Sequence, residues 1–319
     1  GGTIKDFWEN KLNTKVSYLT RSHLSDLYPA KWAKKNILIP ASLFKNYESH
    51  YIECDSKISL DTAHKLWVSK NIENNCFSSL HQFMSLTLSR KGLQSSMFGC
   101  QSNIVLEKGF FNDDNGPIIV EEGVDIMEGV MIRGPVHICK GTTIKMGAKI
   151  YGPVIIGPHC KIGGEVSNSI FLGFSNKAHE GFLGDSIVGE WCNIGAGTSN
   201  SNLRNDYGSV KMWDYIQSKF NDSGRQFLGL YMGDHSKCAI NTSFNTGTTV
   251  GVNCNVFGPG FPRNYIPSFS WGGSQGVKKY DFDKAIEVAE KIMSRRHIKI
   301  TNKYVEMLRR VYDIVLKMK

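Results

Sequence analysis

Isoleucine recurs at every sixth position through the middle of the chain. The residues are Ile126, Ile132, Ile138, Ile144, Ile150, Ile156 and Ile162. An α-helix would scatter a six-residue period around its axis, and a β-strand alternates with a period of two. The period therefore predicts a short strand followed by a turn, repeated along the chain.

A second column of small or β-branched residues stands two positions before each isoleucine. Its members are Val124, Val130, Val136, Thr142, Ala148, Val154 and Cys160. Because alternate residues of a strand share a face, both columns should point the same way, into a core. Gly157 and Gly163 supply the backbone freedom that a corner needs. The pattern predicts a parallel β-helix of hexapeptide repeats, in which each coil buries its neighbour.

The period resumes twice after it is interrupted. It returns first at Phe182, Val188 and Ile194, and then at Met232, Cys238, Phe244, Val250 and Val256. The interruptions are residues 164–181 and a long polar excursion at residues 199–229. Long loops on a rigid scaffold usually carry function, so both segments are candidates for a site.

The repeat predicts a mainly β protein with different segments on either side. We expect residues 1–100 to form a partial α/β domain, in which KKNILIPASLF indicates a buried strand that ends at Pro40. Residues 101–276 should form the β-helix. Residues 277–319 predict two C-terminal helices from their spaced apolar positions. The chain opens on glycine rather than methionine, and we expect it to be incomplete at its start.

The chain is basic, with 38 Lys and Arg against 29 Asp and Glu. No nucleic-acid-binding motif accompanies this charge, so we expect no nucleic-acid partner. The same charge would attract a phosphorylated or CoA-type substrate. No run of eighteen apolar residues and no signal peptide is present, which favours a cytoplasmic protein without membrane contact.

The 8 cysteines are scattered and form no CxxC pair. Neither a zinc site nor a disulfide framework is indicated, and we expect no metal ligands. Cys192 and Cys254 fall at the small inward position, and Cys238 falls in the apolar column. These thiols are therefore expected to be core residues.

The segment NKAHEGFLGDSIVGEWCNIGAGT resembles the acetyltransferase half of the bifunctional bacterial enzymes that make UDP-N-acetylglucosamine. IMEGVMIRGP, MGDHSKCAINTSFNTGTTVGV and FPRNYIPSFSWGG resemble a divergent bacterial branch of that family. The resemblance is dense over residues 100–296 and thin over residues 5–45. It implies a left-handed β-helix, acetyl-CoA as a substrate, and a homotrimer with the acetyl site between its copies. It implies Mg²⁺ only if a nucleotidyltransferase activity is present.

The resemblance also assigns roles to single residues. His179 falls on the family's general base. Phe182 falls where the family has a tyrosine near the sugar phosphate, so the ring is kept and the hydroxyl is lost. Asn193 and Asn202 match asparagines that contact substrate, and Ala196 matches a backbone contact to acetyl-CoA.

Further matches are less regular. Lys211 matches a lysine that the family has in the excursion, although an insertion shifts its position. Arg133 matches a phosphate-binding arginine of the family, although its spacing to the histidine differs by nearly one coil. Asn168 stands where the family has a phosphate-binding lysine, which leaves the acceptor open. The corner Gly195-Ala196-Gly197 should expose N–H groups to a carbonyl or pyrophosphate oxygen. Lys177 should help close the site over a phosphate.

Acetyl transfer to an amine needs a base, a donor to the thioester oxygen, and alignment of both substrates. An ordinary histidine titrates near pH ~6.5 and can accept the proton at neutral pH. Extending the apolar column back from Phe182 reaches Asn176, so His179 falls at a turn. Together with these residues, the resemblance implies an acetyl-CoA-dependent N-acetyltransferase acting on an amino-sugar phosphate such as glucosamine-1-phosphate, in nucleotide-sugar synthesis.

Other functions remain open at this stage. One is a sugar-1-phosphate nucleotidyltransferase whose β-helix assembles subunits, although no phosphate-cradling loop precedes residue 100 and we expect no uridyltransferase activity from these residues. Another is a non-catalytic scaffold. A zinc site between subunits, built from His159, His179 and His235, is disfavoured because no two of them are closely spaced.

Overall fold

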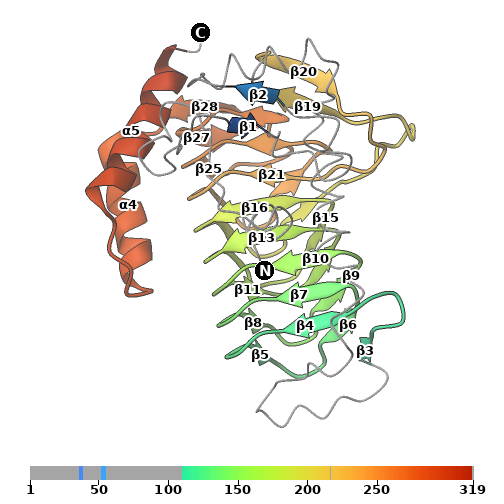
Figure 1. The fold of residues 1–319 in the computed structure, drawn as a ribbon. Coiled ribbons are helices and arrows are strands. Elements are labelled where there is room, and N and C mark those ends of the chain that lie inside the picture. Colours follow the sequence, from blue (N-terminus) through green and yellow to red (C-terminus); the bar gives the residue numbers. More distant parts are fainter. Residues whose placement is uncertain (1–35, 39–51, 55–109, 216, 318–319) are drawn as a thin grey trace. The chain divides into compact units, whose positions relative to one another are not determined.

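The computed structural model describes residues 36–38, 52–54, 110–215 and 217–317 (Figure 1). These residues fall into two units. The first holds the antiparallel pair β1 (Asn36–Leu38) and β2 (Ile52–Cys54), together with residues 301–311. Strand β1 confirms the strand predicted within KKNILIPASLF, and the rest of the domain predicted for residues 1–100 lies outside the described residues. The second unit holds residues 110–300 and 312–317.

The second unit is a parallel β-helix of about 9 turns, as its repeat predicts, and it is left-handed, as the resemblance implies. Each coil contributes strands to three sheets, and the strands of each sheet stack along the helix axis (Figure 1). The first sheet contains β3 (Phe111–Asn112), β6 (Met131–Arg133), β9 (Lys149–Tyr151), β12 (Glu165–Ser167) and β15 (Phe182–Gly184), and the pair β18 (Ser199–Asn200) and β23 (Ser243–Phe244) follows β15.

The other two sheets are longer. The second contains β4 (Ile118–Val120), β7 (Val136–Ile138), β10 (Val154–Ile156), β13 (Ile170–Gly173), β16 (Ile187–Glu190), β21 (Tyr231–Met232), β24 (Thr249–Val250) and β26 (Tyr265–Ile266). The third contains β5 (Asp125–Ile126), β8 (Thr143–Ile144), β11 (Lys161–Ile162), β14 (Asn176–Lys177), β17 (Asn193–Ile194), β22 (Lys237–Cys238), β25 (Asn255–Val256), β27 (Ser270–Gly273) and the antiparallel β28 (Gly276–Lys279).

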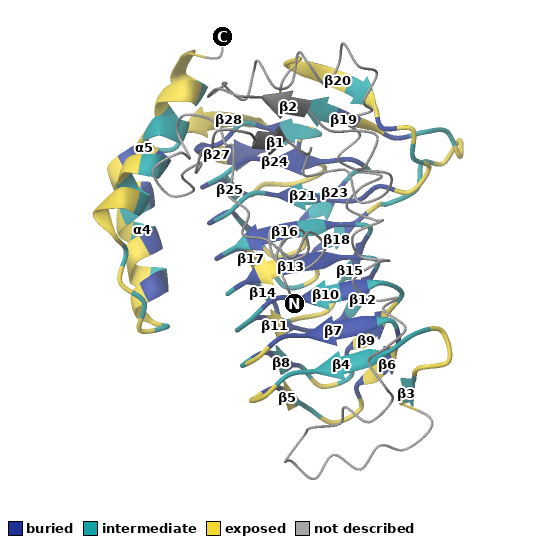
Figure 2. Cartoon of the chain, in the orientation of Figure 1, coloured by how far each residue is buried: buried dark blue, intermediate teal, exposed yellow. Residues whose placement is uncertain are grey.

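The register between coils confirms the two inward columns. Ile138 pairs with Ile156, Ile144 pairs with Ile162, and all four side chains are 0% exposed. The small column is buried as well, from Val124 at 8% exposed to Cys160 at 0%. Figure 2 shows this burial along the stacked strands. Up to Ile162, the core of the coil is therefore a continuous apolar stack.

The coil shortens after Ile162, and there the predicted column was wrong at one residue. Val166 pairs with Leu183, so Leu183 occupies the inward position and is 1% exposed. Phe182 pairs with Glu165 and is only partly buried. Of two adjacent residues in a strand only one can face inward, and the register that continues from Val166 selects Leu183.

The thiols of the repeat are core residues, as predicted. Cys160, Cys192, Cys238 and Cys254 are buried and free. Burial raises the pKa of Cys160 and that of Cys254 to about 12. These thiols stay protonated at neutral pH, so they are poor nucleophiles.

The polar excursion leaves the coil after β18 and returns at β21. It carries an antiparallel hairpin of β19 (Lys211–Asp214) and β20 (Lys219–Asp222). The Trp213 ring stacks on the Tyr265 ring with 3.9 Å between centroids, which holds the hairpin against β26 of the second sheet.

The two predicted C-terminal helices are α4 (Phe282–Ser294) and α5 (Asn302–Lys317). Helix α4 begins at Asp281, whose carboxylate accepts a hydrogen bond from the Lys284 N–H at 3.0 Å and so satisfies one free N–H of the first turn. Its buried face is Phe282, Ala285, Ala289 and Met293. Neither helix of the described residues combines the length and apolarity needed to cross a membrane.

Replacement of one inward isoleucine should weaken the whole solenoid. We expect Ile162→Ala to lower the free energy of unfolding by about 2–5 kcal/mol, because the coil cannot collapse around the missing atoms. Leu172, on the same coil and 50% exposed, is the matched control, and Leu172→Ala should change stability by less than about 0.5 kcal/mol. Urea unfolding of both variants tests this, and equal losses would contradict the inward assignment.

Candidate functional site

His179 lies exposed in the turn that follows β14, as the sequence predicts. The corner of the next coil, residues 195–197, stacks directly on this turn. The Gly197 N–H donates to the Glu180 carbonyl oxygen at 2.9 Å. His179 and Ala196 are therefore on neighbouring corners of one edge of the solenoid.

Lys177 lies beneath this turn, in the inward column of the third sheet. Its strand neighbour on β11 is Ile162, and its side chain is only 2% exposed. The ammonium donates to the carbonyl oxygens of Gly163 and His179, each at 2.9 Å. Burial lowers the pKa of Lys177 to about 8. The structure thus points this charge into the coil, where it holds the turn of His179, rather than out towards a phosphate.

Phe182 and Asn202 meet over Gly184. A Cβ atom on Gly184 would lie 2.4 Å from the Phe182 ring and 3.0 Å from the Asn202 amide nitrogen, so only glycine allows both to pack there. The Asn202 amide donates to the Asp185 carboxylate at 2.6 Å. The resemblance assigned Phe182 and Asn202 separately, and the structure brings them together.

Asn200 and Asp185 contact the candidate residues around Gly184, and the sequence did not reveal them. Asn200 takes an inward position, 5% exposed, and its side chain accepts from the Gly184 N–H at 2.9 Å and donates to the Gly184 carbonyl at 3.0 Å. Asp185 orients the Asn202 amide through the hydrogen bond described above. An asparagine inside a hydrophobic column was the available signal, but it lies where the period breaks.

The corner Gly195-Ala196-Gly197 does not expose all the N–H groups that the sequence analysis expected. The Gly197 N–H is already paired with Glu180, so it is not free for a substrate oxygen. Gly195 is required by packing, since a Cβ there would lie 2.4 Å from the Ala239 carbonyl carbon. The contact predicted between Ala196 and acetyl-CoA stays a prediction.

The remaining predicted residues lie farther out. Asn193 is exposed on β17, beside Asn176 of β14. Arg133 is three strands from Gly184 in the first sheet, which corresponds to about 14 Å between backbones. Lys211 begins β19 in the excursion. Within the described residues, no hydrogen bond or ion pair links Arg133 or Lys211 to the corner at His179.

His159 and His235 belong to an aromatic ladder on a different corner. His159, Phe174, Trp191 and His235 stack with centroid separations of 5.1, 4.2 and 6.2 Å. Two rings separate His159 from His235, and His235 is 0% exposed. A zinc site shared by His159, His179 and His235 is therefore ruled out by geometry.

A cleft of about 390 Å³ opens at the base of the excursion. Its lining includes Ser201, Leu203, Arg204, Asp206, Asn245 and Thr246. The Arg204 guanidinium pairs with the Asp206 carboxylate, so its positive charge is largely balanced within the chain. The cleft adjoins Asn202 in sequence, next to the Phe182 and Gly184 cluster.

No protein-family model matches the chain. The chain is 34% identical over 162 residues to the bifunctional sugar-1-phosphate nucleotidylyltransferase/acetyltransferase of Sulfurisphaera tokodaii. This match covers 49% of this chain and 40% of that protein. The chain is also 39% identical over 90 residues to the bifunctional protein GlmU of Methanocaldococcus jannaschii, covering 28% of this chain and 21% of that protein. The chain thus spans less than half the length of these curated relatives.

Two solved structures are similar in part. The polySia-specific acetyltransferase NeuO has a TM-score of 0.37 and 13% identity, over 59% of this chain and 94% of that one. An Arabidopsis UDP-N-acetylglucosamine acyltransferase has a TM-score of 0.24 and 10% identity, over 57% of this chain and 72% of that one. The strand pairing described above, rather than these scores, establishes the fold.

The buried ammonium of Lys177 should make stability depend on pH. Its pKa is about 8 in the folded protein against 10.5 for an ordinary lysine, so between these values the unfolded chain binds more protons. Stability should therefore rise with pH across that window, by about 3 kcal/mol from this residue. Denaturant unfolding of wild type and Lys177→Met at pH 7, 9 and 11 isolates the effect, because other groups cancel in the difference. Parallel curves would show that burial does not lower the pKa of Lys177.

Proposed function

We propose that the protein transfers an acetyl group from acetyl-CoA to the amine of an amino-sugar phosphate, with His179 as the general base. The observation that carries the proposal is the exposed His179 on a turn fixed from below by Lys177. A base must stay in place while a proton moves, and a buried hydrogen bond to its own carbonyl restrains the backbone that carries it.

The proposed chemistry needs only a few groups. His179 takes the proton as the amine nitrogen attacks the thioester carbonyl, and the imidazolium then protonates the departing CoA thiolate. Phe182 and Asn202 form the surface on which the sugar lies, and Asp185 holds the Asn202 amide. Asn193 provides a further polar contact on the same edge.

The curated relatives support this reaction class. One of them is named for sugar-1-phosphate nucleotidylyl transfer and acetyl transfer together. Glucosamine-1-phosphate is the acceptor that we propose to try first. Nucleotidyl transfer is a second candidate, which only that name supports. Release of pyrophosphate from UTP in the presence of Mg²⁺ would distinguish it from acetyl transfer.

Removal of the base should slow the chemical step. We expect His179→Ala to lower kcat by about 10²–10⁴-fold with KM nearly unchanged, since the imidazole acts mainly on a proton in transit. The assay follows free thiol released from acetyl-CoA in the presence of glucosamine-1-phosphate and related amino-sugar phosphates.

His159→Ala is the matched control, because this histidine stacks on Phe174 at a different corner. It should leave kcat within about twofold of wild type, provided that the fold is kept. Near-normal turnover by His179→Ala would remove His179 from the mechanism. If no acceptor led to release of free thiol from acetyl-CoA, the proposed function itself would be wrong.

We also propose that three copies assemble through the β-helix and complete the site together. Arg133 and Lys211 do not reach His179 within one chain, so a neighbouring copy must supply them if they bind substrate. The first sheet also exposes Met131 at 40% and Tyr151 at 39%, which gives its outer face apolar side chains for a neighbour to cover. The excursion at residues 199–229 is the arm that we assign to reach that neighbour.

The assembly can be measured directly. Multi-angle light scattering at micromolar concentration should give three times the chain mass of 35.7 kDa. Tyr151→Glu should reduce this mass, because a charge would have to be buried in the contact. A monomer for the wild type would overturn the shared site.

A further inference from the structure

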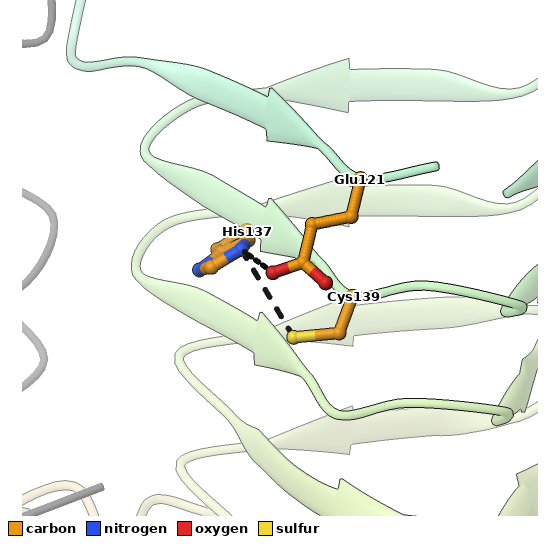
Figure 3. Close-up of side chains that lie close together, drawn as sticks. All are labelled: Glu121, His137 and Cys139. Carbon is orange, nitrogen blue, oxygen red and sulfur yellow. Dashed lines mark hydrogen bonds and ion pairs between the residues drawn. The ribbon is translucent and has the colours of Figure 1, made fainter. Parts of the chain in front are cut away.

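Three side chains able to bind a metal lie together on the outer face of the second sheet, far along the coil from His179 (Figure 3). His137 lies within β7, Cys139 directly follows it, and Glu121 directly follows β4. Val120 pairs with Ile138, so the same register places Glu121 beside Cys139. One potential ligand atom from each residue lies within 4.8 Å of the other two.

The separations suit a tetrahedral zinc ion after small movements. The His137 Nε2 atom lies 2.8 Å from the Glu121 Oε1 atom and 4.0 Å from the Cys139 Sγ atom. Ordinary zinc bond lengths put a nitrogen and an oxygen ligand about 3.4 Å apart, and a nitrogen and a sulfur ligand about 3.6 Å apart. Shifts of about half an ångström, within reach of side-chain rotation, would meet these values.

The cluster is also prepared for a cation by its surroundings. The second oxygen of Glu121 accepts from the Lys140 N–H at 3.0 Å, which turns the first oxygen towards His137. Burial alone would raise the pKa of Glu121, but hydrogen bonds, the one from the Lys140 N–H foremost, hold it at about 2. Burial lowers the pKa of His137, so the ring is neutral and keeps a lone pair at neutral pH. Two of the three donors are thus in their ligating form.

The charge balance favours a divalent ion as well. His137 is 8% exposed and Cys139 is 5% exposed, although both face outward from the coil. The Cys139 thiol would release its proton when the metal–sulfur bond forms. One carboxylate and one thiolate then neutralise the two positive charges of the ion, which lowers the cost of a buried site.

We propose that Glu121, His137 and Cys139 bind one Zn²⁺ ion, with a fourth position for water or another ligand. An oxygen, a nitrogen and a sulfur donor together suit zinc, a cation of borderline softness, better than Mg²⁺ or Ca²⁺. The ion joins the first coil to the second, at the end of the described solenoid. Within the described residues this first coil pairs with a coil on one side only, so the ion would add a link where the pairing is fewest.

Cobalt titration of the metal-free full-length protein tests the site. CoCl₂ should bind with one ion per chain and give the near-ultraviolet charge-transfer band of a cobalt–thiolate bond, which ZnCl₂ should then remove. Cys139→Ala should abolish the band. His137→Gln and Glu121→Gln should weaken cobalt binding by about tenfold or more, and the Glu121 variant keeps the size and shape of its side chain.

Cys160→Ala and His159→Gln are the matched controls, since both residues lie in the same solenoid outside the cluster, and both should keep the band. Zinc should raise the melting temperature of the wild type and leave that of Cys139→Ala unchanged. A wild-type protein that shows no thiolate band would overturn the proposal. A band that survives in Cys139→Ala would do the same, because it would come from another cysteine of the chain. Loss of stability in the variants without any metal signal would show that the cluster is held by hydrogen bonds alone.

Discussion

The backbone hydrogen bonds between successive coils are the constraint on which the rest of the molecule depends. They place each inward residue about 4.8 Å above an inward residue of the coil below, so a column once begun must continue. Ile132, Ile150 and Val166 form such a column in the first sheet. When the coil shortens, the column itself stays in place and only the residue that fills it changes. This is why Leu183, rather than Phe182, faces the core.

Lys177 shows how this constraint connects the core to the proposed site. The register of β14 puts a lysine where neighbouring coils have isoleucine. A buried ammonium needs acceptors, and the nearest are the carbonyl oxygens of Gly163 and His179. The exposed turn therefore gains an anchor inside the coil. Burial of a charge in a hydrophobic column lowers the stability of the fold. The hydrogen bonds of Lys177 offset part of this loss, and the one to His179 holds the turn in one conformation.

The same register also organises the outer surface. The ladder from His159 to His235 consists of residues at equivalent places on neighbouring coils. The metal cluster likewise joins Glu121 of one coil to His137 and Cys139 of the next. A solenoid repeats its corners and faces, so any side chain with suitable chemistry meets its counterpart one coil away. Sites of this kind need no loop and no local motif.

The six-residue period by itself determined the β-helix, its inward columns except at Phe182, the buried thiols and the turn position of His179, because burial at that spacing has only one regular solution. The period also marked the two interruptions where the site was expected. Only the tertiary structure decided the burial of Lys177, the meeting of Phe182 with Asn202, and the cluster around His137. These features arise where the period breaks or on the outer faces, and there long-range pairing between coils, rather than local sequence, sets which residues become neighbours.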